Sequence, residues 1–134
     1  MAYRFVDHTA ELQLELEAPT REGVLGEAVL ALGELLGGDE ATGGGELVRR
    51  RLAVAAADDA ALLAAWIDEV VFVAESEALV PRRAEAVEVD EGKARGTVTF
   101  APGAPPHLVK GVTYHDLLLA PGETGWRGRA VLDV

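Results

Sequence analysis

Residues 11–18 alternate strictly between polar and apolar side chains. Leu12, Leu14 and Leu16 share one face of this segment, and acidic and amide side chains share the other. A period of two residues is typical of a half-buried strand with one face in solvent. Strand patterns also occur at residues 47–57, 84–89, 94–100, 112–119 and 126–134. A further strand-like run precedes Asp7, so the pattern predicts a protein rich in β-structure.

Two other segments have the spacing of amphipathic helices. Apolar residues recur every three or four positions across residues 24–36 and again across residues 62–74. Each segment would bury one apolar stripe against the rest of the protein. Thr20 is placed to cap the first helix, and Asp58 or Asp59 is placed to cap the second.

The predicted elements fit a single domain that spans residues 1–134, because no linker, internal repeat or low-complexity tail divides the chain. The Asp90-Glu91-Gly92-Lys93 stretch predicts a hairpin turn between two of the strands. Helices with one apolar stripe and strands with one wet face are expected to form two layers. We therefore predict an α+β fold, a two-layer sandwich in which both helices pack on one face of a mainly antiparallel sheet.

Composition excludes several classes of protein. The chain has no cysteine, which excludes disulfides, thiolate metal sites and cysteine nucleophiles. Its formal net charge of −11 argues against direct nucleic-acid binding and suits a basic protein partner, hard cations or simple solubility. The sequence has no charged-then-apolar leader and no apolar run of about 18 residues. We therefore expect a cytoplasmic protein that does not span a membrane.

Motifs of the common enzyme classes are also missing from the sequence. Ser76 is the only serine, and it lies between two glutamates with no histidine nearby. We find no nucleophile elbow, phosphate-binding loop or dinucleotide-binding fingerprint. We therefore assign no catalytic residue and expect a protein that is not an enzyme.

The densest polar cluster is the stretch Asp7-His8-Thr9-Ala10-Glu11, which lies between the first two strands. The last strand ends in Asp133 and Val134. If that strand end lies near Glu11, two side-chain carboxylates and the terminal carboxylate of Val134 converge. Such a group is unfavourable unless a cation neutralises it. Hard divalent cations prefer oxygen ligands of this kind.

Ordinary structural roles fit the same residues. The stretch Asp7-His8-Thr9 suits a turn in which side chains accept backbone N–H groups. Glu11 suits the wet face of its strand, and Asp133 suits an ion pair with Arg127 or Arg129. The residues alone do not decide between these roles and a cation site.

A third polar cluster, Thr113-Tyr114-His115-Asp116, lies inside a predicted strand. Strand alternation places His115 on one face, and Tyr114 and Asp116 on the other. A histidine in a half-buried strand is more often structural than a ligand. We therefore predict a structural role for His115.

Four of these segments together resemble the archease family. The chain contains Asp7-His8-Thr9-Ala10-Glu11, an amphipathic helix around Trp66, Lys110-Gly111-Val112-Thr113-Tyr114-His115, and Val131-Leu132-Asp133-Val134. They occur in the family's order and run from end to end of the chain. Family members usually carry Asp where this chain has Glu11, and the extra methylene is expected to alter cation affinity more than the fold.

The resemblance implies an accessory protein of a guanylate-dependent RNA ligase. Such ligases join 2′,3′-cyclic-phosphate and 5′-hydroxyl ends in tRNA splicing or RNA repair, and archeases promote their guanylylation and multiple turnover. It also implies a divalent cation, Ca²⁺ before Mg²⁺, held by Glu11, Asp133 and an oxygen of Val134. The residues expected to support this site or contact the partner are Asp7, His8, Thr9, Lys110, His115 and Asp116.

Two alternatives from other functional classes stay open at this point. A stand-alone metal-dependent phosphoester hydrolase would combine the carboxylates with His8 or His115 as a base. A general chaperone-like binding module would need an exposed apolar patch.

Overall fold

The computed structural model describes residues 1–8, 11–37, 45–107 and 109–134. Within these residues the chain forms two helices and seven strands. Their order along the chain is β1 (Ala2–His8), β2 (Glu11–Ala18), α1 (Arg21–Gly37), β3 (Val48–Ala55), α2 (Asp59–Glu77), β4 (Leu79–Asp90), β5 (Lys93–Pro102), β6 (Gly111–Pro121) and β7 (Trp126–Asp133). All of the predicted segments therefore fold as the elements that their patterns indicate.

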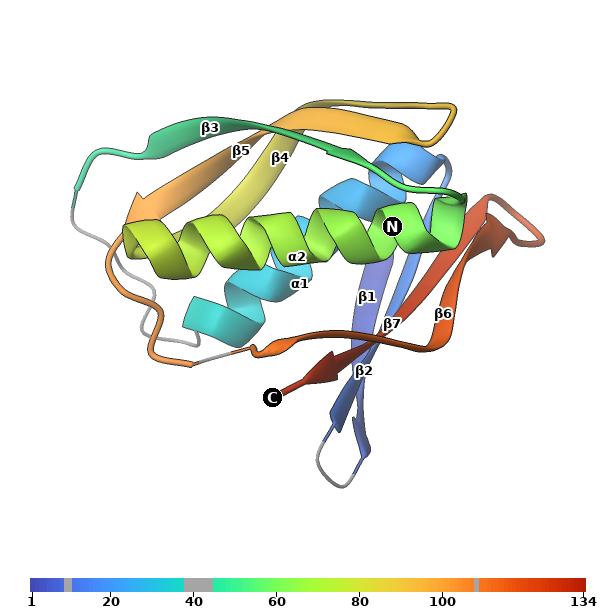
Figure 1. Ribbon diagram of the computed structural model, residues 1–134, viewed down its shortest axis with the longest axis horizontal. Helices are drawn as coiled ribbons and strands as arrows, with labels where there is room; N and C mark the ends of the chain where they lie inside the picture. The colour runs from blue at the N-terminus through green and yellow to red at the C-terminus, as the bar shows by residue number, and fades with distance from the viewer. Residues whose placement is uncertain (9–10, 38–44, 108) are drawn as a thin grey trace.

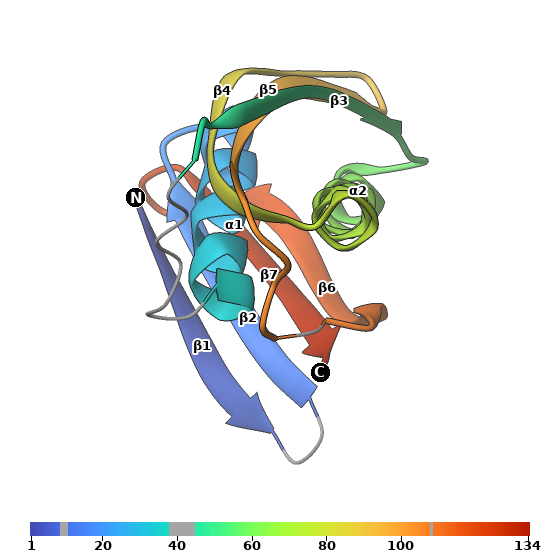
Figure 2. The ribbon, with the colours of Figure 1, turned by 90° about the vertical axis from the view of Figure 1, so that its left-hand side faces the viewer.

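The described strands form two sheets, one of four strands in the order β1-β2-β7-β6 and one of three in the order β3-β5-β4. Neighbouring strands in both sheets are antiparallel. The two helices lie on the same face of the four-stranded sheet, and the three-stranded sheet covers their other side (Figures 1 and 2). The predicted α+β sandwich is confirmed, and so is the placement of both helices on one face of a sheet.

The division of the strands between two sheets goes beyond the prediction, which expected one sheet. Helix α1 packs against both β4 and β2, and α2 packs against both β6 and β3. The physical reason is visible in α1, whose buried residues include the adjacent pairs Val24-Leu25 and Ala28-Val29. An apolar surface wider than one stripe needs cover on two sides, which the second sheet provides.

Side chains cap both helices where the sequence predicts it. The hydroxyl of Thr20 accepts a hydrogen bond from the backbone N–H of Gly23 at 3.0 Å. At the start of α2, Asp58 rather than Asp59 is the cap, and its carboxylate accepts from the N–H of Ala61 at 2.8 Å. These bonds satisfy donors that the first turn of a helix leaves unpaired.

The core between the sheets is centred on the helices. Trp66 of α2 is fully buried, and its indole N–H donates to the carbonyl of Leu25 in α1 at 3.1 Å. This bond ties the two helices together and satisfies the only polar atom of the indole. No helix within the described ranges is long and apolar enough to cross a membrane.

Candidate functional site

One end of the four-stranded sheet brings the two predicted carboxylates together. Glu11 begins β2, Asp133 ends β7, and the two are directly opposite in the antiparallel register. His8 of β1 is the backbone partner of Glu11, and Gly111 of β6 is the partner of Asp133. Four strands therefore contribute one row of residues at this end of the sheet. We call Glu11, Asp133 and the adjoining Val134 the tip.

The tip lies on the outer face of the sheet, away from the helices. Along β2, Leu14, Leu16 and Ala18 are buried, so Glu11 belongs to the opposite, polar face. Asp133 faces the same side, since directly opposite residues of an antiparallel pair share a face. Glu11 is exposed, and Asp133 is half-buried.

On this outer face, each acid of β2 other than Glu11 lies opposite an arginine of β7. Glu17 lies opposite Arg127, and Glu15 lies opposite Arg129. Glu15 also accepts a hydrogen bond from the Nε of Arg4 at 2.7 Å, and this bond lowers the pKa of its carboxyl.

At the tip, an acid faces an acid. The Cβ atoms of directly opposite residues lie about 4.5–5.5 Å apart, and like charges at that separation destabilise a sheet. Neither Glu11 nor Asp133 forms an ion pair with any described residue.

An ion pair between Asp133 and Arg127 or Arg129, one of the two roles left open by the sequence, is not formed within the described chain. Arg129 points its Nε toward β6, where it donates to the carbonyl of Asp116 at 2.9 Å. The carbonyl of Asp133 accepts from the backbone N–H of Lys110 at 2.7 Å. This bond fixes the backbone of Asp133 and places the exposed Lys110 beside the tip.

Among the described residues, no three histidine, aspartate or glutamate side chains lie close enough together to hold a metal ion. The tip itself offers two side-chain carboxylates and the oxygens of Val134, which is 46% exposed. This donor set consists of oxygen alone, which suits Ca²⁺ or Mg²⁺ with water completing the coordination.

The stretch before Glu11 is only partly described. Asp7 and His8 belong to β1 and are the backbone partners of Leu12 and Glu11. Their side chains, together with all of Thr9, lie outside the described part of the chain. Neither the turn that we predict for Asp7, His8 and Thr9 nor a role for these residues at the tip is tested by the structure.

The predicted placement of His115 on a half-buried strand face is wrong, because β6 does not keep its alternation there. The register with β7 shifts between Thr113 and Leu118, and Asp116 adopts a left-handed φ of 56°. As a result Tyr114, His115 and Asp116 are all exposed, and His115 pairs with Asp116 at 3.1 Å. The bulge begins three residues after Gly111, about 10 Å along the strand from the row of the tip, so His115 is not beside the carboxylates.

Asp68 of α2 is a polar residue that the sequence patterns did not single out. Strand β6 is the edge of the four-stranded sheet, and α2 packs against it. Burial of the Asp68 carboxyl raises its pKa, and a hydrogen bond with the backbone of Val112 acts in the opposite direction. In the sequence, the one signal for this residue was an acid inside the apolar run of a predicted helix.

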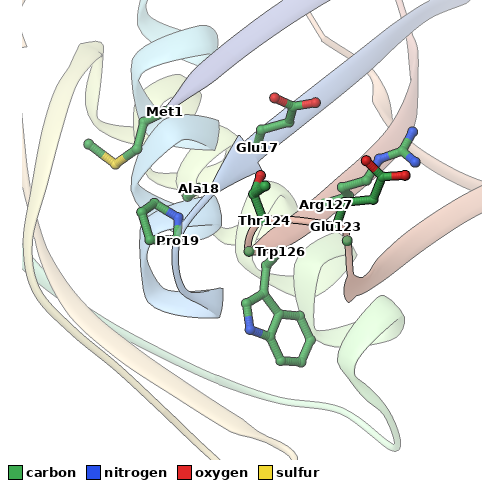
Figure 3. A pocket seen from close by; sticks show the side chains of 10 residues that line it. Met1, Glu17, Ala18, Pro19, Glu123, Thr124, Trp126 and Arg127 are labelled. Carbon is green, nitrogen blue, oxygen red and sulfur yellow. The ribbon is translucent and has the colours of Figure 1, made fainter.

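A hollow of ≈ 330 Å³ lies at the opposite end of the same sheet, lined by the end of β2 and the turn between β6 and β7. Figure 3 shows Glu17, Thr124 and Arg127 at this hollow, with the indole of Trp126 pointing away from Glu17. The guanidinium of Arg21 lies 5.4 Å from the centre of that indole ring. Glu17 is six residues from Glu11 along β2, about 20 Å, so the hollow is separate from the tip.

Residues 3–134 match the model of the archease protein family (MTH1598/TM1083). A probable protein archease of Mycobacterium tuberculosis is 34% identical over 98% of this chain and 74% of its own length. A protein archease of Methanosarcina barkeri is 26% identical over 98% of this chain and 95% of its own length.

Two solved structures share the fold. The solution structure of Methanobacterium thermoautotrophicum protein 1598 matches with a TM-score of 0.70 and 21% identity, covering 98% of both chains. The crystal structure of an archease from Thermotoga maritima, described as a possible chaperone, matches with a TM-score of 0.65 and 17% identity over 96% of this chain and 94% of its own. The family model and the mycobacterial relative, each spanning nearly the whole chain, show that this protein belongs to the archease family.

Proposed function

We propose that this protein is an accessory factor of a guanylate-dependent RNA ligase in the cytoplasm, where it promotes guanylylation and multiple turnover of the ligase. The ligase reaction joins 2′,3′-cyclic-phosphate and 5′-hydroxyl RNA ends in tRNA splicing or RNA repair. Membership of the archease family supports an accessory role. The description of the Thermotoga maritima relative as a possible chaperone agrees with a protein that acts on another protein.

The single observation that carries the proposal is the pairing of Glu11 with Asp133. The two strands bring an acid opposite an acid, although the same strands place an arginine opposite each of Glu15 and Glu17. A chain selected only for stability would not keep like charges at the exposed end of an otherwise complementary face. The arrangement is explained if the tip works by binding positive charge.

In this proposal the tip approaches the nucleotide site of the ligase. A divalent cation, Ca²⁺ before Mg²⁺, would be held by Glu11, Asp133 and a Val134 oxygen, and would supply positive charge where phosphates are handled. The pairing of β2 with β7 holds the two carboxylates side by side. The bond from the Lys110 backbone N–H to the Asp133 carbonyl keeps the strand end in place without using a carboxylate oxygen.

The test is RNA joining by a guanylate-dependent ligase at limiting concentration with GTP. We would compare no addition, the unaltered protein, Asp133→Asn and Glu15→Gln. The last variant removes the same charge from the same face away from the tip. Multiple turnover with the unaltered protein and Glu15→Gln, but not with Asp133→Asn, is the expected result.

Two outcomes would contradict the proposal in different ways. Activation that persists in Asp133→Asn would remove the tip from the mechanism while leaving the accessory role. An unaltered protein that gives no stimulation of the ligase would show that the accessory role itself is wrong.

A further inference from the structure

Helix α2 carries charge of one sign only. Its 19 residues include no basic side chain, and its acidic side chains are Asp59, Asp68, Glu69, Glu75 and Glu77. The two end residues are neutralised, Asp59 by Arg21 at 3.1 Å and Glu77 by Arg50 at 2.7 Å. The three acids between them form no ion pair with a described residue.

The position of these acids does not favour the helix. Glu75 lies in the last turn of α2, where the helix dipole is negative and disfavours a carboxylate. Asp68 and Glu75 are seven residues apart, two turns along the same face. An uncompensated acid in the last turn, such as Glu75, adds nothing to the stability of α2, and its presence needs another explanation.

A large aromatic side chain lies in the middle of this acidic face. Phe72 is four residues after Asp68 and three before Glu75, so all three share one side of the helix. Its side chain is 63% exposed, although most apolar residues of α2 are buried. Tyr114, on the bulge of β6, is 71% exposed. Exposed aromatics beside charged groups are typical of protein-binding surfaces.

The acidic face of α2 adjoins the tip through β6. Helix α2 packs against β6, the edge strand of the four-stranded sheet. Val112 is the neighbour of Gly111, which lies directly opposite Asp133. Figure 1 shows the first part of β6 running alongside α2. Helix α2 therefore lies along the same strand whose first residue is the backbone partner of Asp133.

We propose that Asp68, Phe72, Glu75 and Tyr114 form a docking surface, the α2–β6 face, for a basic surface of the RNA ligase next to its nucleotide site. This inference rests on the function proposed above. A protein that handles RNA presents cationic surfaces to phosphates, and these complement the acids of α2. Phe72 and Tyr114 supply apolar anchors, while the acids steer the approach of the partner.

Charge also argues against other occupants of the α2–β6 face. RNA is repelled by acids, and helix α2 has no arginine or lysine to neutralise a phosphate. A second copy of this chain carries the same net charge of −11, which opposes close approach. Of the three occupants considered, a basic protein surface is the one whose charge complements the α2–β6 face.

The experiment measures the dissociation constant for the purified ligase by calorimetry. The test variants are Phe72→Ala, Glu75→Lys and the two combined. The matched controls are Leu30→Ala, which removes a 41% exposed apolar side chain from α1, and Glu91→Lys, which reverses an exposed charge in the β4–β5 turn. Circular dichroism and melting temperature show that each variant is folded.

We expect the combined variant to bind the ligase about tenfold or more weakly, as for loss of an interface anchor, and both controls to bind like the unaltered protein. Binding by the combined variant equal to that of the unaltered protein would overturn the inference while leaving the activation by the tip intact. A change in self-association or in RNA binding, without a change in ligase affinity, would overturn it as well. An unaltered protein that neither binds nor stimulates the ligase would instead refute the proposed function.

Discussion

The carboxylate pair at the tip predicts that removal of one negative charge makes the protein more stable when no divalent cation is present. Glu11 and Asp133 are direct neighbours across β2 and β7, so their Cβ atoms lie about 5 Å apart, and we take this as the scale of their charge separation. Two unit charges at that distance in water repel with about 0.8 kcal/mol, reduced by salt to about 0.5 kcal/mol. We therefore expect Asp133→Asn in chelator to raise the free energy of unfolding by about 0.5–1 kcal/mol.

The melting temperature is the convenient assay for this change. Entropies of unfolding scale with chain length, so for this 134-residue chain the gain corresponds to a rise of about 2–4 °C. Glu15→Gln is the matched control, since Glu15 accepts from Arg4 and lies opposite Arg129. The same loss of charge is expected to lower the melting temperature there.

Added Ca²⁺ should reverse the order of the unaltered protein and Asp133→Asn. Binding to the folded state alone adds about 2.7 kcal/mol of stability at a cation concentration 100 times the dissociation constant. The unaltered protein is expected to gain this stabilisation, and the variant to gain little. The reasoning is refuted if Asp133→Asn is less stable than the unaltered protein in chelator, or if Ca²⁺ raises both melting temperatures equally.

Three further perturbations test the packing, the capping and the surface charges of the fold. Trp66→Phe removes the indole N–H that donates to Leu25 and leaves a void, so urea denaturation should show a loss of about 2–4 kcal/mol. Asp58→Ala removes the cap of α2 and should cost about 1 kcal/mol in the same assay. Arginine partners hold the pKa of Glu15 and of Glu77 below the ordinary value of 4.5, so the unfolded state binds more protons in acid and stability falls as pH drops below that value. Urea titrations at about pH 5 and pH 3 should show a smaller loss for the Glu15→Gln, Glu77→Gln double variant than for the unaltered protein, and an equal loss would contradict the assignment.

The secondary structure was largely predictable because its signals are local. The strict alternation over residues 11–18 corresponds to β2, and Thr20 and Asp58 cap the helices as their residue types indicate. Where a local rule failed, a distant residue was the cause. His115 is exposed because β6 bulges in its pairing with β7, and Arg129 of β7 bonds to the carbonyl at that bulge.

The candidate site shows the same limit. The sequence marked Glu11 and Asp133 as unusual acids at the ends of strands, and the family resemblance joined them. Their residue types could not show that the two strands pair in a register that sets one opposite the other. Nor could the sequence indicate the contact of Asp68 with the edge of β6, since helix periodicity says which side of α2 is polar but not which strand lies there.

By itself the sequence determined the strands, the helices, their caps and the apolar surfaces that must be buried, because each of these follows from the spacing of neighbouring residues. Only the tertiary structure decided that the strands divide into two sheets around the helices, that acid faces acid at the tip, and that α2 exposes Phe72 among acids. The physical reason is that strand pairing and packing depend on how residues more than a hundred positions apart fit together. A periodic pattern indicates which face of an element is apolar. Which other element covers that face depends on the packing of the whole chain.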